Sequence, residues 1–306
     1  MVEAVATGWQ VRALTRSDAG AQAVQEAGGL TIRGDARRPD GWIAQARGAT
    51  ALVDLLQPRL PRRLTRAAVQ RISAARQALT RGLVAALQGL PAGERPLSVT
   101  VSGAGDLQPD ARSTISHRSP LRTRPRGFAH IGLPVRRLVD ASGLDAVHVY
   151  FGNLVYGPGK VFTEQYVKGL AGGKARVIGS GTNRLPLTHV TDAARALVLV
   201  AGLPHADIVG RSFVAMDGAD ATQRELLDLT ADAMGVKRPG AIPTWLASLV
   251  AGAIAVETIT LDAHADPSAL LDSGFRFRYP SYREGVPATL ARLGKGATTA
   301  APGAVH

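Results

Sequence analysis

The chain has 306 residues, and its 45% hydrophobic and 20% charged content is typical of globular proteins that bury a sizeable core. It contains no cysteine, which excludes disulfide frameworks, thiolate metal sites and cysteine nucleophiles. The formal net charge of +12 makes nucleic acid a partner that has to be considered.

The positive charge is mostly arginine, and one stretch holds it most densely: Arg59, Arg62, Arg63, Arg66 and Arg71. No aromatic residues interleave with these arginines, as stacking on bases would need, so we expect a solvated face and no nucleic-acid partner. The apolar run Trp245–Val256 is shorter than the about 20 residues that span a bilayer, and it predicts a buried helix. Without a signal-peptide pattern either, we expect a cytoplasmic protein with no membrane contact.

Short apolar runs alternate with helical patterns through the first half of the chain. The apolar runs predict buried parallel strands at Val11–Leu14, Leu30–Ile32, Ala51–Leu56, Ser98–Val101 and Ala146–Phe151. Helices are predicted between them at Ala19–Ala27, Pro39–Ala46, Leu64–Leu90 and Val135–Ala141. This alternation predicts an α/β fold, a Rossmann-like doubly wound parallel sheet, over residues 1–152.

The second half is more mixed and predicts a smaller α/β part, for the substrate, over residues 153–293. A strand is expected at Arg176–Ile178, and helices at Asp192–Ala201, Thr222–Gly235, Pro243–Val256 and Tyr282–Leu293. The tail, residues 294–306, is small and polar enough to be disordered.

The beginning of the chain lacks a motif that the rest leads one to expect. A dinucleotide-binding unit normally starts with a strand and a glycine-rich turn, G-x-x-G-x-x-G or G-x-G-x-x-G, and neither pattern occurs in the first 50 residues. We therefore expect an N-terminally truncated sheet, and we leave open whether Met1 is the true start. Loss of that central strand would leave the neighbouring strand edges unpaired.

Several segments resemble the NAD-dependent epimerase/dehydratase family, the extended branch of the short-chain dehydrogenases/reductases. The strongest is Phe-Gly-Asn-Leu-Val-Tyr-Gly-Pro-Gly at residues 151–159, which resembles the family's Asn-x-x-Tyr-Gly-Pro-Gly loop. Others are Val-Arg-Ala-Leu-Thr-Arg-Ser at 11–17, Arg-Gly-Asp at 33–35, and Val-Thr-Val-Ser-Gly-Ala-Gly at 99–105. The resemblance runs from residue 8 to about residue 293.

The resemblance implies a nicotinamide cofactor and assigns residues to it. Thr15, Arg16 and Ser17 follow the family's second strand, where a guanidinium suits the 2′-phosphate of NADP, with NAD as the alternative. Asp35 contacts the adenine amine in this scheme, or caps the next helix instead. The other implied contacts are Leu55 and Leu56, in a turn where small residues are usual, and Phe151 and Asn153 beside the nicotinamide. The missing glycine-rich turn impairs this binding.

By the same resemblance, Ser102 ends the fifth strand and hydrogen-bonds the substrate oxygen. The family's Tyr-x-x-x-Lys pair, about 26 residues further on, is replaced by Phe128 and Gly132, neither of which transfers a proton. His130 is the only titratable side chain in that segment, and it is the candidate acid/base or a helix-face residue with a hydrogen-bond partner.

A small-molecule substrate, such as a nucleotide sugar, is implied to bind Asn153, Tyr156 and Arg184. No metal is expected, because the histidines show no metal-ligand spacing. Pairing of the long arginine-rich helix and its successor, as in the family, implies a homodimer. Three hypotheses remain: an NAD(P)-dependent oxidoreductase or epimerase with an atypical active site, a non-catalytic NADP(H)- or metabolite-binding protein, and a truncated inactive fragment.

Overall fold

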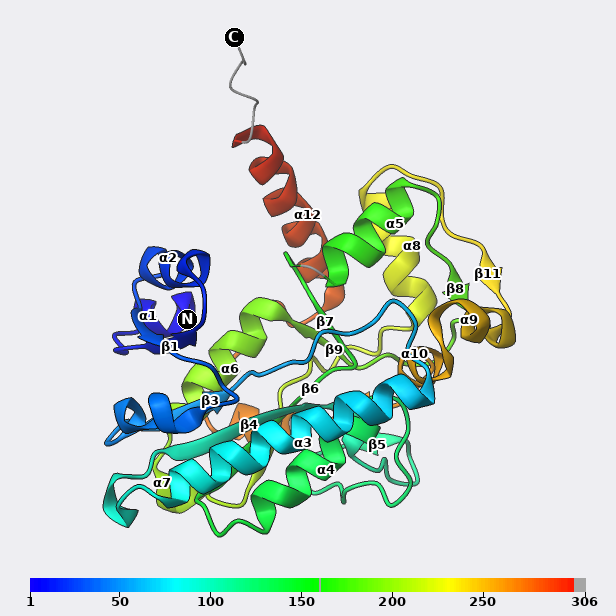
Figure 1. The fold of residues 1–306 in the computed structure, drawn as a ribbon. Helices are drawn as coiled ribbons and strands as arrows, with labels where there is room; N and C mark the ends of the chain where they lie inside the picture. Colours follow the sequence, from blue (N-terminus) through cyan, green and yellow to red (C-terminus); the bar gives the residue numbers. More distant parts are fainter. Residues whose placement is uncertain (160, 300–306) are drawn as a thin grey trace.

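The computed structural model describes residues 1–159 and 161–299. Its central sheet has four parallel strands in the order β10-β6-β4-β3 (Figure 1). These strands are β3 (Ala51–Asp54), β4 (Leu97–Gly103), β6 (Ala146–Phe151) and β10 (Ser212–Val214). Alternate apolar side chains of β4 and β6, among them Val99, Val147 and Val149, form the main core. The predicted Rossmann-like α/β fold is therefore present.

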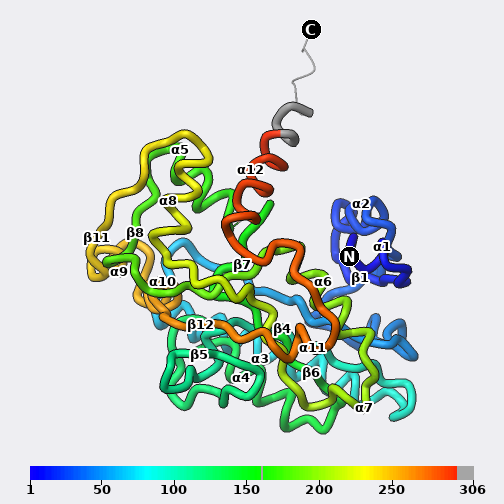
Figure 2. The backbone as a smooth tube through the Cα atoms, turned by 180° about the vertical axis from the view of Figure 1, so that it is seen from behind, coloured from blue at the N-terminus to red at the C-terminus, as the bar shows by residue number. Residues whose placement is uncertain are grey.

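The first two strands stand apart from this sheet. β1 (Arg12–Thr15) pairs in parallel with β2 (Leu30–Arg33), and within the described residues no backbone hydrogen bond joins β1 to β3. Figures 1 and 2 show this N-terminal unit, with α1 (Val2–Ala6) and α2 (Asp18–Glu26), as a separate body beside α6. β3 consequently has a free edge, and Val53 is 37% exposed although buried strands were predicted here.

Helices cover both faces of the four-stranded sheet. α3 (Arg66–Gln88) and α4 (Ala129–Asp140) pack against each other on one face, with α4 against β4 (Figure 1). On the other face lies α6 (Val190–Gly202), which buries Ala193, Ala196 and Val200 in the main core. No described helix is long and apolar enough to cross a membrane.

The remaining elements lie outside the four-stranded sheet and the N-terminal unit. Short parallel pairs are formed by β7 (Leu154–Tyr156) with β9 (Leu187–His189), β8 (Val177–Ile178) with β11 (Ala241–Ile242), and β5 (Thr114–Ile115) with β12 (His264–Ala265). The helices are α5 (Lys168–Ala171), α7 (His205–Ile208), α8 (Gln223–Ala233), α9 (Thr244–Ala251), α10 (Ala253–Ile259), α11 (Ser268–Asp272) and α12 (Tyr282–Thr299). A π-helical turn at Phe162–Val167 and 3₁₀ turns at Pro39–Gly41, Ile43–Ala46, Ala92–Glu94 and Ala104–Asp106 complete the described chain.

Four segments differ from the sequence-based expectation. The helix predicted at Pro39–Ala46 is two 3₁₀ turns, and the one predicted at Pro243–Val256 is broken at Gly252, whose φ of 93° favours glycine. α12 continues to Thr299 rather than ending near Leu293, while residues 300–306 of the predicted tail lie outside the described chain.

The fourth difference is α4, which begins at Ala129, six residues before the predicted start, and runs through Pro134. Proline has no N–H, so the carbonyl of His130 loses its partner one turn earlier. The Ser73 hydroxyl on α3 donates to that carbonyl at 2.8 Å. A neighbouring helix therefore supplies the bond that makes the interior proline tolerable, which sequence patterns along one segment do not reveal.

Candidate functional site

Two guanidinium groups gather where β1 and β2 end. Asp35, just after β2, accepts hydrogen bonds from Arg37 Nη2 at 2.6 Å and Nε at 3.0 Å, and Arg16 Nη1 lies 3.9 Å from the same carboxylate. The hydrogen bonds from Arg37, with a smaller contribution from Arg16, lower the pKa of Asp35 to about 2. Arg16 and Arg37 are both exposed, so they present positive charge to solvent at the carboxyl ends of parallel strands.

The turn that carries Arg16 is held by its neighbours. Ser17 caps α2 by accepting from the backbone N–H of Gly20 at 3.1 Å, and a Cβ at position 20 would overlap the Thr15 hydroxyl. The carbonyl of Asp35 accepts from Trp42 Nε1 at 3.1 Å. The predicted cofactor residues in this region are Thr15, Arg16, Ser17 and Asp35, and Arg37 is not among them. The Asp-x-Arg spacing, which places the two side chains within one turn, is the sequence pattern that indicates it.

At the end of β3 the predicted cofactor residues behave differently. Leu55 is exposed, whereas the backbone N–H of Leu56 bonds to Asp54 Oδ1 at 3.0 Å. Asp54 is in turn paired with Arg76 of α3 at 2.5 Å, and both side chains are almost fully buried. This pair ties the strand end to α3.

Ser102 lies near the carboxyl end of β4 and donates a hydrogen bond of 2.6 Å to Asp106 Oδ2. The chain turns immediately after β4, through the 3₁₀ turn Ala104–Asp106, and this brings the residue four positions later back to Ser102. Asp106 is 1% exposed, and burial raises its pKa to about 7 against the opposing effects of Ser102, Arg136 and Arg122.

Gly132 makes room for this pair. A Cβ at position 132 would overlap the Asp106 carboxylate and the Ser102 hydroxyl. By the family resemblance a lysine is expected at position 132. The space that its side chain would need is occupied by the carboxylate of Asp106, which reaches it from the turn after β4. Asp106 was missed by the sequence analysis, and the only signal for it was an acidic residue four places after the predicted Ser102.

His130 is not brought to Ser102. It lies two positions from Gly132, so its side chain leaves α4 on a different side from the one that faces Asp106. Within the described residues no hydrogen bond or ion pair to its imidazole is present. Phe128 packs with an apolar cluster that includes Leu64, Val69 and Ile254.

The residues after β6 divide into two groups. Asn153 lies near the Ser102 turn: its Oδ1 is 3.8 Å from where a Cβ of Gly105 would lie, and its Nδ2 donates to the carbonyl of Thr258 at 3.0 Å. Phe151 is buried in the main core. Tyr156, in contrast, is fully buried in a second core, where burial raises its pKa and its hydroxyl has no hydrogen-bond partner in the described structure.

Arg184 is held away from this group. Its guanidinium binds the Asp262 carboxylate at 2.9 and 3.0 Å and also contacts His264. Of the three predicted substrate residues, only Asn153 therefore lies beside the Ser102 turn. Among the described residues, no group of three or more His, Asp or Glu is placed to hold a metal ion.

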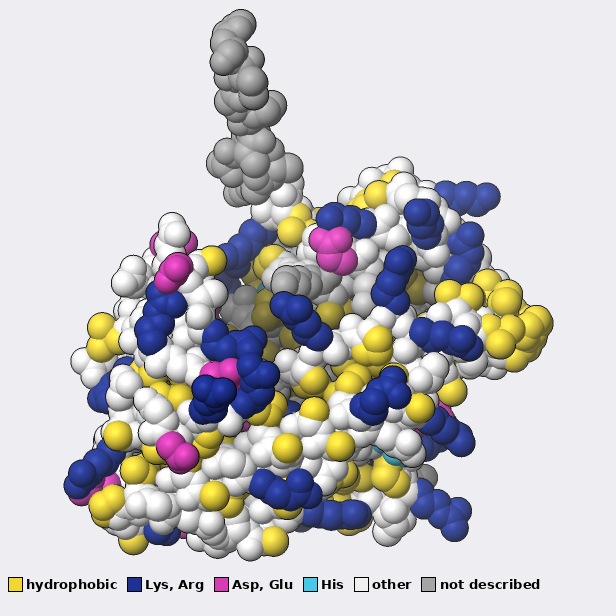
Figure 3. Space-filling model, viewed as in Figure 1, with side chains coloured by type: hydrophobic (Ala, Val, Ile, Leu, Met, Phe, Trp, Pro, Cys, Tyr) yellow, Lys and Arg dark blue, Asp and Glu magenta, His cyan; other side chains and the backbone are white. Residues whose placement is uncertain are grey.

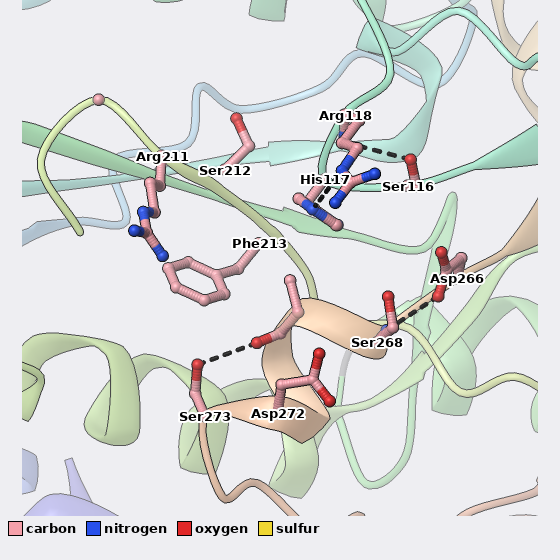
Figure 4. A pocket seen from close by; sticks show the side chains of 12 residues that line it. Ser116, His117, Arg118, Arg211, Ser212, Phe213, Asp266, Ser268, Asp272 and Ser273 are labelled. Atoms are coloured by element: carbon pink, nitrogen blue, oxygen red, sulfur yellow. Dashed lines mark hydrogen bonds between the residues drawn. The ribbon is translucent and has the colours of Figure 1, made fainter. Parts of the chain in front are cut away.

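A cavity of about 850 Å³ lies elsewhere, beside the amino end of β10 (Figure 4). Polar and charged side chains from three segments face it: Ser116, His117, Arg118, Arg211, Ser212, Asp266, Ser268, Asp272 and Ser273. None of the predicted site residues lines it. The cavity is therefore distinct from the group formed by Ser102, Asp106 and Asn153 at the carboxyl ends of β4 and β6.

Comparison with known proteins gives a fold but no close relative. No protein-family model matches this sequence, and no curated protein matches it. The crystal structure of human epimerase family protein SDR39U1 (isoform 2) with NADPH matches with a TM-score of 0.74 at 20% identity, covering 92% of this chain and all of that one.

Two bacterial enzyme structures match over similar lengths. UDP-glucuronic acid 4-epimerase from Bacillus cereus, in complex with UDP-glucuronic acid and NAD, has a TM-score of 0.72 at 14% identity and covers 96% of this chain and 94% of its own. dTDP-glucose 4,6-dehydratase from Bacillus anthracis with NAD has a TM-score of 0.70 at 12% identity, over 95% and 90%. These matches confirm the Rossmann-like α/β fold of epimerase and dehydratase structures.

Proposed function

We propose that this chain, which shares its fold with nicotinamide-dependent epimerases and dehydratases, is an NADP(H)-dependent oxidoreductase or epimerase with an atypical active site. Its acid–base group is the pair formed by Ser102 and Asp106, which stands in place of Tyr-x-x-x-Lys. The observation that carries the proposal is the 2.6 Å hydrogen bond between these side chains at the carboxyl end of β4. Asp106, with a pKa of about 7, is suited to exchange a proton near neutral pH.

The residues present fit one end of NADP(H). Arg16 and Arg37 are exposed at the ends of β1 and β2, where two guanidinium groups can bind the 2′-phosphate in a bidentate manner. Asp35 lies between them and, with its lowered pKa, is ionised and available to the adenosine. The described residues supply no glycine-rich turn for the pyrophosphate, so the fit is at the adenosine end.

The side chains of Ser102 and Asp106 then provide a path for the proton. The bound nicotinamide supplies or accepts the hydride. In the direction of oxidation, the substrate hydroxyl passes its proton to Ser102 Oγ while Ser102 passes its own proton to Asp106; reduction runs the same steps in reverse. Asn153, beside this turn, orients the substrate.

The substrate class is part of the proposal, and the ligands of the matched structures suggest it. Two of the matched structures contain UDP-glucuronic acid, so a nucleotide sugar is the first substrate to test. Arg184 can take part only if it leaves Asp262. Tyr156 is too deeply buried in the described structure to contact a substrate.

The divided sheet favours a second candidate function. Asp106 is 1% exposed, and β1 and β3 do not pair. A protein that binds NADP(H) or a metabolite without turnover would have these features.

Calorimetric titration with NADPH and with NADH is the first test. We expect micromolar binding of NADPH that is tighter than that of NADH. Arg16→Gln and Arg37→Gln should each weaken NADPH binding about tenfold, as expected when one charge-assisted bond of roughly 1.5 kcal/mol is lost, with little effect on NADH. Arg33→Gln, an exposed arginine paired with Asp18, is the matched control. Equal affinities for both nucleotides contradict the NADP assignment, and no binding to either contradicts the assignment of a nicotinamide cofactor.

Turnover separates the enzyme from the binding protein. Turnover of a panel of nucleotide sugars is measured both as net formation of reduced nicotinamide, for an oxidoreductase, and as formation of the epimer, for an epimerase that returns the hydride. It should be abolished in Asp106→Asn and Ser102→Ala, with NADPH affinity retained. His130→Gln, which removes the imidazole on another side of α4, should leave turnover unchanged. Loss of turnover in His130→Gln alone would show that the acid–base assignment is wrong.

A further inference from the structure

Two features that are far apart in the sequence meet on one surface. In the dense arginine stretch, Arg59, Arg62 and Arg63 precede Leu64 and Arg66 follows it. The apolar run at Trp245–Val256 forms α9 and α10. The backbone N–H of Leu64 donates to the carbonyl of Ala251 at 2.8 Å, and that of Ile254 donates to the carbonyl of Leu64 at 3.3 Å. These two bonds hold the arginine stretch against the junction between α9 and α10.

α9 is exposed, whereas the sequence predicted a buried helix. Trp245 is 65% exposed, Leu249 58% and Val250 72%, with Leu246 at 36%, while Ala247 is the buried residue of the helix. The prediction was wrong for this half of the run because Gly252 breaks the helix: α10 then buries Ile254 and Val256. Figure 3 shows the result as a hydrophobic cluster over α9 at the right edge of the molecule, with basic side chains around it.

The arginines beside this cluster are available for a partner. Arg59, Arg62, Arg63 and Arg66 are all exposed, and none forms an ion pair within the part of the chain that the structure describes. Between Ala233 and Val256 the sequence has two basic residues, Lys237 and Arg238, and no acidic one. The α9 surface, defined as the exposed apolar residues of α9 with Arg59, Arg62, Arg63 and Arg66, is thus apolar in part and strongly positive.

We propose that the α9 surface docks on an anionic lipid bilayer. Tryptophan and aliphatic residues on one side of a helix, with arginines beside them, are the combination that binds the boundary between headgroups and acyl chains. Anionic headgroups attract the arginines, whose aliphatic stems remain in the apolar layer. The absence of a spanning helix led to the expectation of no membrane contact, but a helix that lies on a bilayer does not have to span it.

Two other partners fit this surface less well. In a two-fold dimer the same patch would meet itself, so the arginines of both copies would enter one interface to which the α9 surface brings no acidic residue. A nucleic acid would satisfy the arginines, but it would leave Leu249 and Val250 without an apolar partner, and a single exposed tryptophan offers little base stacking. An anionic bilayer satisfies both the charges and the apolar residues.

The α9 surface is also connected to the candidate site. α10 follows α9 directly and carries Thr258, whose carbonyl accepts the hydrogen bond from Asn153. Glu257, its neighbour, accepts from the backbone N–H of Gly127 just before α4. A docked α9 would therefore lie next to the helix that holds Asn153.

Flotation with vesicles tests this proposal on the full chain. We expect binding to vesicles of phosphatidylcholine with about one third phosphatidylserine, weak binding to phosphatidylcholine alone, and loss of binding as salt rises. The partition coefficient should fall at least tenfold in Leu249→Ser/Val250→Ser and about fivefold for each arginine removed in Arg62→Gln/Arg63→Gln. The controls are Val2→Ser/Val209→Ser and Arg112→Gln/Arg137→Gln, which change exposed residues elsewhere by the same chemistry and should bind as the wild type does.

Several results would overturn the proposal. One is no binding to phosphatidylserine vesicles at low salt by a protein whose circular dichroism shows it folded. Another is a partition coefficient that is the same for the α9 variants and for the control variants. A dimer in sedimentation that only Leu249→Ser/Val250→Ser dissociates would assign the surface to a second copy. Tryptophan emission gives an independent measure, since Trp245 should shift to the blue with anionic vesicles and the shift should be lost in Trp245→Phe.

Discussion

The carboxylate of Asp106, in the turn after β4, packs directly against Gly132 of α4, and a Cβ at position 132 would overlap it. A side chain at position 132 would therefore have to displace Asp106 or Ser102. The same absence of a side chain allows Asp106 to bond to Ser102. The face of α4 that carries Gly132 thus packs against a polar pair rather than against an apolar side chain.

Gly132→Ala should destabilise the protein by about 1–3 kcal/mol, because the added methyl group overlaps a buried carboxylate. Alanine favours an isolated helix over glycine by about 1 kcal/mol, so packing and propensity act in opposite directions. Chemical denaturation measures the difference. Gly218→Ala, at an exposed glycine with free space around it, is the control, and equal effects of the two substitutions would show that position 132 is not crowded.

Stability should depend on pH through Asp106. Burial raises its pKa in the folded chain to about 7, above its ordinary value of 3.8, so between these values the folded state holds a proton that the unfolded state has lost. The contribution of Asp106 to the free energy of unfolding should therefore fall, by an amount on the order of a few kcal/mol, as pH rises from about 4 to about 7, and level off above. Burial raises the pKa of Asp217 to about 8, so this second carboxyl adds a fall of the same sign that continues to about pH 8.

Asp106→Asn should make that fall shallower and leave only the part that Asp217 contributes. Asp207→Asn, at an exposed carboxyl, should leave the whole fall in place. Denaturation curves at intervals of pH, for the wild type and both variants, make the comparison. An unchanged slope in Asp106→Asn would place the titration on another group.

Arg76 and Asp54 form a nearly buried ion pair between α3 and β3. Arg76→Leu should destabilise the protein by about 3–5 kcal/mol, because it leaves the Asp54 carboxylate buried without its partner. Arg76→Leu/Asp54→Asn should recover most of that loss, since the charge itself is removed. A double variant as unstable as the single one would indicate that the arginine acts through its contacts with α3, such as the bond to Thr80, instead.

Gly252→Ala tests the junction between α9 and α10. The φ of 93° disfavours alanine, and a Cβ there would overlap the backbone of Leu64. A loss of about 1–3 kcal/mol is expected. Gly240→Ala, with open space and an ordinary φ, is the matched control for unfolding. Equal melting of the two variants would show that the junction tolerates a side chain.

The fold class and the main strands could be predicted from the amino-acid sequence alone. β6 matches its predicted bounds, and no end of the other four predicted strands of the first half is more than two residues from the observed end. Buried parallel strands leave this signal because both of their faces are apolar, so a short apolar run bounded by turns is enough. Among the described strands β1 and β3 do not pair with each other, so each has an unpaired edge.

Only the tertiary structure decided which side chains meet. That Asp106 turns back onto Ser102, that Ser73 compensates for Pro134, and that Arg37 joins Arg16 at Asp35 depend on contacts across elements. The composition of the apolar run at α9 does not show whether the helix lies in the interior or on the surface. A hydrophobic pattern along a helix indicates which face is apolar, but it does not indicate what packs against that face. The break at Gly252, set by its packing against Leu64, left α9 exposed beside the arginines.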